Sequence, residues 1–134
     1  MRYLAVLAVL TAMLGSVPSV AASCRPSLIS VVESRQLLRL LPDVTAAMTA
    51  GITVTILQYS QPGSDQVAHF SIWAKAGTVP TVLDNGLLGY FAVGRQTAQV
   101  TNVADDPIGG GPEFKHYQMV LVSRHCLTTA SSAT

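Results

Sequence analysis

The hydrophobic pattern of this chain changes its period once, at Gly51, and that change restricts the fold more than any other feature. Before it, residues 28–41 carry apolar side chains at helical spacing, with Ser27 as a candidate N-cap and Pro42 as a helix breaker. After it, residues 52–59 are β-branched and largely alternate between apolar and polar. The chain therefore begins as helix and continues as strand.

The rest of the sequence extends this pattern into a fold class. Asp43 is a candidate cap for a second short segment that ends at Gly51, so the helical region is either one kinked helix or two short ones. Strand-like sequence follows at residues 67–74, 87–93, 98–103 and 115–124. Because strands and helices do not alternate, we expect an α+β fold in which the N-terminal helix packs on an antiparallel sheet of about five strands.

The first 22 residues have the features of an export signal. Arg2 supplies a positive charge, residues 4–14 form an apolar run, and small side chains precede a cleavage point before Ser23, with cleavage before Cys24 as the alternative. The apolar run is too short to cross a hydrocarbon core of about 30 Å. We therefore expect a periplasmic or secreted protein without a membrane span, and an acylated Cys24 is a further alternative.

Within the exported part, we expect a single α+β domain over residues 23–126 and a flexible tail of small residues at 127–134. The whole chain has 8 Lys and Arg against 7 Asp and Glu, and removal of Arg2 with the signal leaves seven of each. With 49% hydrophobic residues the chain is too apolar to be disordered. A neutral domain also lacks the basic surplus that nucleic-acid binding needs.

Cys24 and Cys126 are the two cysteines, and they stand at opposite ends of the predicted domain. An even number of cysteines in an oxidising compartment predicts a disulfide, here between the first exported residues and the end of the last predicted strand. Two isolated cysteines cannot form a structural zinc site. A catalytic thiol would need a base, and His125 would point to the opposite face of a strand.

Residue patterns for catalysis, metals and cofactors are weak. The histidines are His69, His116 and His125, and none stands in a nucleophile-elbow motif. Asp105, Asp106 and His116 lack a ligand spacing that would fix a metal, and we read the two acids as part of a turn. The glycines at 109–111 lack the P-loop lysine, and we expect a flexible connection there without a following helix. We expect no enzyme activity, no metal and no cofactor.

Residues 89–100 carry a family resemblance. An aromatic–x–Val strand turns through a short segment ending in Thr97-Ala98 and leaves on Val100. This stretch resembles the terminal hairpin of PepSY-like domains, and similar hairpins occur in other small exported bacterial proteins, including cystatin-like inhibitors and immunity proteins against cell-wall-degrading toxins. The resemblance implies a non-catalytic fold that binds or blocks other proteins, often peptidases or cell-wall hydrolases, and it implies no catalytic residue.

Candidate binding residues come from one strand face and three loops. Trp73 shares its predicted strand face with His69 and Ser71, which makes it the best candidate for an exposed anchor, with a core position as its alternative. Loops at 62–66, 78–86 and 105–113 would contribute further contacts. The predicted binding residues are Trp73, His69, Asp84, Asn85, Asp105, Asp106 and Glu113.

Three functions fit this sequence. The first is an exported binding protein, an inhibitor or immunity protein with a protein partner such as a peptidase or cell-wall hydrolase. The second is a periplasmic small-molecule or lipid binder with an apolar pocket between helix and sheet. The third is a small hydrolase that acts through one of its histidines. No residue pattern specifies the oligomeric state.

Overall fold

The structure is a computed structural model that describes residues 24–59, 65–75 and 85–128. Its first helix begins with a capping box. The Ser30 hydroxyl accepts from the Glu33 backbone N–H at 3.0 Å, and the Ser30 backbone N–H donates to the Glu33 carboxylate at 3.0 Å. Helix α1 spans Val31–Arg39, and Pro42 opens a separate helix α2, Pro42–Thr49. Of the two alternatives for this region, two short helices are correct.

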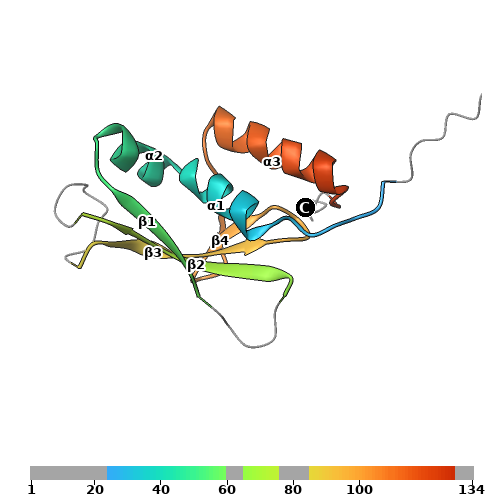
Figure 1. Cartoon of the computed structure of the whole chain (residues 1–134), viewed down its shortest axis with the longest axis horizontal. Helices are drawn as coiled ribbons and strands as arrows, with labels where there is room; N and C mark the ends of the chain where they lie inside the picture. Colours follow the sequence, from blue (N-terminus) through green and yellow to red (C-terminus); the bar gives the residue numbers. More distant parts are fainter. Residues whose placement is uncertain (1–23, 60–64, 76–84, 129–134) are drawn as a thin grey trace, which may run out of the picture.

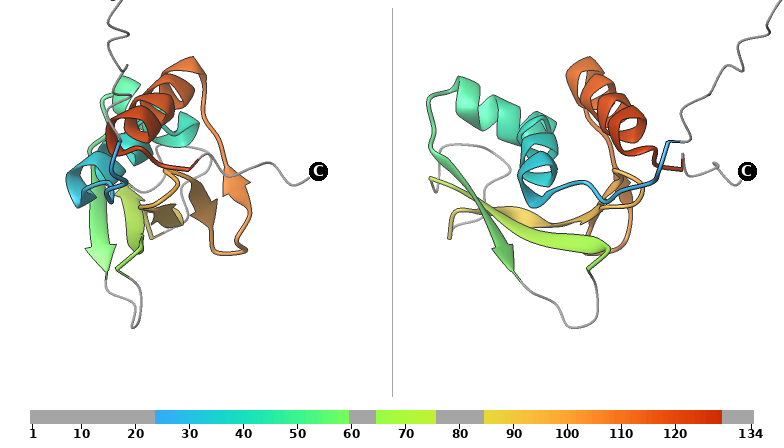
Figure 2. Two further views of the ribbon diagram at one scale, coloured as in Figure 1. Left: turned by 90° about the vertical axis from the view of Figure 1, so that its right-hand side faces the viewer. Right: turned by 45° about the vertical axis from the view of Figure 1, so that its right-hand side comes forward.

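The strands form one antiparallel sheet in sequence order. Their bounds are β1 Val54–Tyr59, β2 Val67–Ala74, β3 Leu87–Gly94, β4 Val100–Asn102 and β5 Pro107–Ile108, with each strand paired to the next. The first four strands lie where alternation predicted them, and the resembling stretch at 89–100 contributes to the β3–β4 hairpin. All helices of the described residues lie on one side of the sheet (Figures 1 and 2). The predicted α+β class is confirmed.

The predicted fifth strand at residues 115–124 is wrong, because this segment belongs to helix α3, Pro112–His125. Its β-branched content suggested a strand, but Phe114 and Leu121 are buried seven residues apart and Tyr117 packs between them, which is helical spacing. Pro112 occupies the first turn, where its missing N–H costs nothing. The fifth strand is instead β5, in the segment we expected to be an irregular glycine-rich loop.

The glycine-rich segment therefore leads into a helix, contrary to our expectation. Gly110 has a packing role there, since a Cβ at this position would collide with the side chain of Phe114, whereas Gly109 and Gly111 have open space. Phe114 is 1% exposed and belongs to the core between helices and sheet. The glycine thus leaves room for the buried Phe114 side chain beside the chain that leads into α3.

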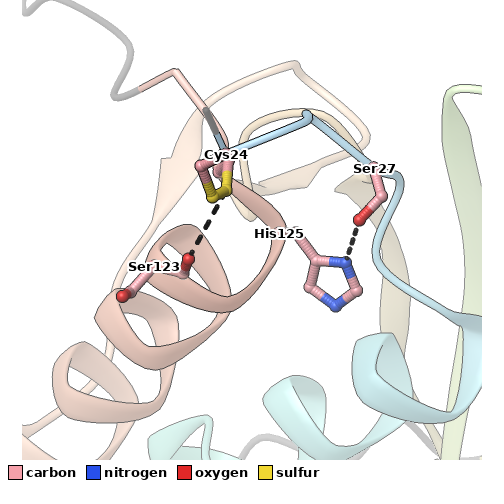
Figure 3. Close-up of a disulfide and its surroundings, with 5 residues drawn as sticks. Cys24, Ser27, Ser123 and His125 are labelled. Carbon is pink, nitrogen blue, oxygen red and sulfur yellow. Dashed lines mark hydrogen bonds between the residues drawn. A yellow bond between two sulfur atoms is a disulfide. The ribbon is translucent and has the colours of Figure 1, made fainter. Parts of the chain in front are cut away.

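The end of α3 holds the N-terminal segment against the fold. The Ser27 N–H donates to the His125 carbonyl at 3.0 Å, and the predicted disulfide joins Cys24 to Cys126 (Figure 3). Cys126 ends a helix rather than a strand. The next residue, Leu127, donates to the Val122 carbonyl and is buried in the core, so the packed unit extends one residue beyond its predicted boundary.

No helix in the described ranges combines the length and apolar character that a membrane crossing requires.

Candidate functional site

The two faces of β2 differ sharply in what covers them. Phe70 and Ile72 are fully buried and point toward the helical layer. His69 and Trp73 alternate with them and lie on the opposite face, where no described element covers the sheet (Figure 2). The predicted face assignment of this strand agrees with the structure.

Neighbouring strands extend this opposite face into a group of large side chains. The register pairs Tyr59 with His69 and places Leu57 and Tyr90 on either side of Ser71. The ring of Tyr59 lies 5.7 Å from that of His69 and packs edge-on against Tyr90 at 5.9 Å, measured between centroids. We define the open sheet face by five of these residues: Leu57, Tyr59, His69, Trp73 and Tyr90.

The open sheet face is accessible and uncharged. Leu57 is 51% exposed and Tyr90 is 42% exposed, and they form a patch of large side chains with Tyr59, which packs against Tyr90. Trp73 is half-buried, and its indole N–H donates to the Ser71 hydroxyl at 2.9 Å. None of the five carries a formal charge when His69 is neutral, so the face offers apolar area and hydrogen-bonding groups.

One predicted loop residue, the acid Asp105, borders this face. Asp105 lines a hollow of about 340 Å³ together with Tyr59, His69 and Tyr90. The backbone at Asp105 has a positive φ of 58°, in a turn where its N–H donates to the Asn102 carbonyl at 3.1 Å. The structure thus brings Trp73, His69 and Asp105 to one side of the sheet.

The other predicted binding residues are dispersed. Asn85 closes the turn before β3 by accepting from the Leu87 N–H at 3.1 Å, and Asp106 donates its N–H to the Asn102 side chain at 3.1 Å. Glu113 stands in the first turn of α3, in the helical layer. Asp84 lies outside the described residues.

Three members of the face, Leu57, Tyr59 and Tyr90, are not among the predicted binding residues. Aromatic side chains in strands are usually core or half-buried residues, so the sequence alone does not single out Tyr90 as exposed. The alternation in residues 52–59 already placed Tyr59 in phase with Thr55 and Leu57, away from Ile56. The missing information was the pairing register, because only the register shows which positions of different strands share a face.

An apolar groove of about 810 Å³ lies in the helical layer, between α2 and the start of α3. Leu40, Pro42 and Phe114 contribute to its walls, and Glu113 stands at its side. The small-molecule hypothesis expected a pocket enclosed between helix and sheet, whereas this groove runs between helices.

A second polar cluster surrounds His125 at the end of α3. The Ser27 hydroxyl lies 2.8 Å from His125 Nδ1, and both oxygens of Glu33 lie 2.9 Å from Nε2. Arg124 forms an ion pair with the same carboxylate at 2.9 Å. We call this group the Glu33–His125 cluster, made of Ser27, Glu33, Arg124 and His125.

The Glu33 carboxylate is the centre of this cluster. Its burial raises its pKa, but hydrogen bonds from Ser30, His125 and Arg124 outweigh this effect and lower the pKa from 4.5 to about 2. The carboxylate is therefore ionised over the physiological range. It fixes the start of α1 to the end of α3.

In the Glu33–His125 cluster, the imidazole of His125 lies between a hydroxyl and a carboxylate and contacts both. These three groups are the components of nucleophilic catalysis. The expected strand would have pointed His125 away from the Cys126 thiol, whereas helix α3 places it beside Ser27 and Glu33. Acyl transfer also needs N–H groups aimed at a developing oxyanion. The Ser27 N–H already donates to the His125 carbonyl, and the Glu33 carboxylate is shared with Arg124 and the helix cap.

Across the described ranges, no three His, Cys, Asp or Glu side chains are grouped closely enough to hold a metal ion. His116 and the pair Asp105 and Asp106 therefore do not assemble into such a group.

Comparison with known proteins gives a likeness of fold. No known family profile matches the chain, and no curated protein sequence matches it. A chain from the structure of a type VI secretion system effector–immunity complex from Pseudomonas protegens is similar at a TM-score of 0.51. The two chains are 17% identical, and the match covers 84% of this chain and 89% of that one. The resemblance to PepSY-like and cystatin-like domains stays a prediction.

Proposed function

We propose that this chain is an exported, non-catalytic binding protein of the immunity or inhibitor type. Its open sheet face would bind a folded protein effector, such as a peptidase or cell-wall hydrolase, and block it. The observation that carries this proposal is the accessible, uncharged group of Leu57, Tyr59, His69, Trp73 and Tyr90. The fold shared with a chain of an effector–immunity complex supports it.

The composition of the open sheet face favours a protein partner over a small ligand. Cores of protein interfaces are enriched in Tyr and Trp and depleted in charged residues, and a few such anchors dominate the binding energy. The hollow beside Tyr90 has a volume of about 340 Å³, at the lower end of the range for small-molecule pockets, and it lies beside a broad sheet surface. A complementary partner would present an apolar surface with hydrogen-bonding groups, and a hydrogen-bond donor or a cation opposite Asp105.

Photocrosslinking followed by reconstitution tests this proposal. For this test, p-benzoylphenylalanine is incorporated in place of Tyr90 in the cells that produce the chain, and the protein that crosslinks to it is identified. That protein is then purified and mixed with the unmodified chain. We expect a stable complex in which the catalytic activity of the captured protein is inhibited. The variants Leu57→Ser and Tyr90→Ser should each raise the Kd at least tenfold, because each removes an exposed anchor of the open sheet face.

Met119→Ser is the matched control, since Met119 is 71% exposed on α3 in the opposite layer. It should leave the Kd unchanged. The proposal is wrong if the control variant weakens binding as much as the face variants do. Capture of a second copy of the chain alone, or of a protein whose activity continues in the complex, also contradicts it.

A hydrolase is the second candidate function. The hydrogen bonds that link Ser27 to His125 and His125 to Glu33 favour it. A fluorophosphonate probe distinguishes the two functions, because it labels a serine only when a neighbouring base activates the hydroxyl. The Ser27 N–H already donates to the His125 carbonyl, and the Glu33 carboxylate is shared with Arg124 and the helix cap. We therefore expect peptide mass spectrometry to detect no labelled Ser27. Labelling that Ser27→Ala abolishes and Ser123→Ala leaves intact would decide for the hydrolase.

A further inference from the structure

Strand β1 forms one edge of the sheet, and no described strand lies on its other side. The direction of its backbone groups follows from β2. The Gln66 carbonyl accepts from the Arg95 N–H at 2.8 Å, and the Ala74 N–H donates to the Gly86 carbonyl at 2.7 Å. Even-numbered residues of β2 therefore direct their backbone groups toward β3, and odd-numbered residues direct theirs toward β1.

The register then identifies the outward groups of β1. Thr55, Leu57 and Tyr59 oppose the odd-numbered residues of β2 and face them. The alternate residues Val54, Ile56 and Gln58 therefore direct their N–H and C=O groups away from the sheet. These groups form a ladder that another strand can pair with.

Nothing in the sequence of this edge prevents such pairing. Exposed edge strands are normally protected by lysine, proline or a bulge, and β1 has none of these over its six residues. The register shift in the sheet lies between β2 and β3, not at β1. This edge is therefore open to an added strand.

A hollow beside the edge would receive a side chain of that strand. It has a volume of about 380 Å³ and is lined by Met48, Val54 and Ile56 among others, with Arg39 at its border. Met48 is 48% exposed, so its flexible side chain is available for contact. Arg39 is exposed, and none of the described residues forms an ion pair with it.

We propose that an extended segment of the protein partner adds to the sheet along β1. The strand pairs with Val54, Ile56 and Gln58, places an apolar side chain in the hollow beside Met48, and brings a carboxylate to Arg39. This inference rests on the proposed function, because it specifies how the blocked protein is held. The open sheet face and the β1 edge adjoin at Leu57, so one partner can contact both.

A model peptide tests the edge without knowledge of the partner. The probe is an acetylated heptapeptide that alternates valine with threonine and ends in glutamate, titrated into the 15N-labelled full domain. We expect slower hydrogen exchange at the Val54 and Ile56 amides on binding. Gln58→Pro removes one outward N–H at an exposed edge position where proline is tolerated, and should raise the Kd at least tenfold. Gln58→Thr keeps the N–H and should bind as the wild type does.

The outcomes separate the edge from the proposed function. Suppose that Gln58→Pro and Gln58→Thr bind the peptide with equal Kd, and also bind with equal Kd a captured partner whose affinity depends on Leu57 and Tyr90. This result overturns strand addition and leaves the proposed function intact. Failure to capture any partner contradicts the function, while the peptide titration still decides the edge. Concentration-dependent protection of the β1 amides without peptide would show a second copy as the occupant and overturn the proposal.

Discussion

Reduction of the Cys24–Cys126 disulfide is expected to lower the midpoint of thermal unfolding by about 15 °C or more, because the bond closes a very long loop. The two cysteines are 102 positions apart, and the chain-entropy model assigns such a loop about 4–5 kcal/mol of unfolding free energy. The bond also holds the N-terminal segment beside α3, where Ser27 meets His125. Calorimetry with and without reductant measures the effect.

Cys126→Ser should reproduce the shift, and reductant should then change the midpoint no further. The matched control is Ser123→Ala, an exposed position on the last turn of α3, which should unfold like the wild type and keep its response to reductant. An unchanged midpoint in the reduced protein would show that the cysteines are not paired in solution.

Replacement of Glu33 is expected to give the second largest loss, with Glu33→Ala lowering the unfolding free energy by about 3 kcal/mol. It removes half of the capping box of α1, the ion pair with Arg124 and the partner of His125 at once. Chemical denaturation of the variant measures the loss. Glu113→Ala is the control, because Glu113 is an exposed acid in the first turn of α3 and should cost only a few tenths of a kcal/mol. Equal losses in the two variants would contradict this assignment.

The same carboxylate predicts how stability depends on pH. The pKa of Glu33 is about 2 in the folded chain against 4.5 for the free side chain, so the unfolded chain binds more protons between these values. Its contribution is fully present above about pH 4.5 and is lost as the pH falls toward 2. Glu33→Gln should flatten the stability profile in this window. A profile as steep as that of the wild type would mean that other acids dominate.

Local patterns were sufficient to predict most of this fold from the sequence. The helix break at Pro42 and the alternation in β1 and β2 depend on neighbouring residues alone. The break and the two strands all lie where the sequence predicts them. The segment 115–124 was misread because its valines favour strands, while the burial of Phe114 and Leu121 that selects a helix depends on contacts with distant elements. The role of Gly110 likewise depends on the position of the Phe114 side chain, which is packed in the core.

The candidate site was less accessible to prediction because it depends on strand register. Trp73 and His69 follow from alternation within one strand, but their grouping with Tyr59 and Tyr90 requires the pairing of three strands. The Glu33–His125 cluster could not be predicted either, since its members are up to 98 positions apart. A predicted helix over residues 112–125 would have placed His125 on its last turn instead of on a strand face.

The closeness of Cys24 and Cys126, whose Cα atoms are 5.7 Å apart, means that the folded unit starts and finishes at one corner of the helical layer. A circular permutant would need only a short linker across this corner, with its new termini in a surface turn. A carrier protein or surface attached at the same corner would likewise leave the far side of the sheet unobstructed.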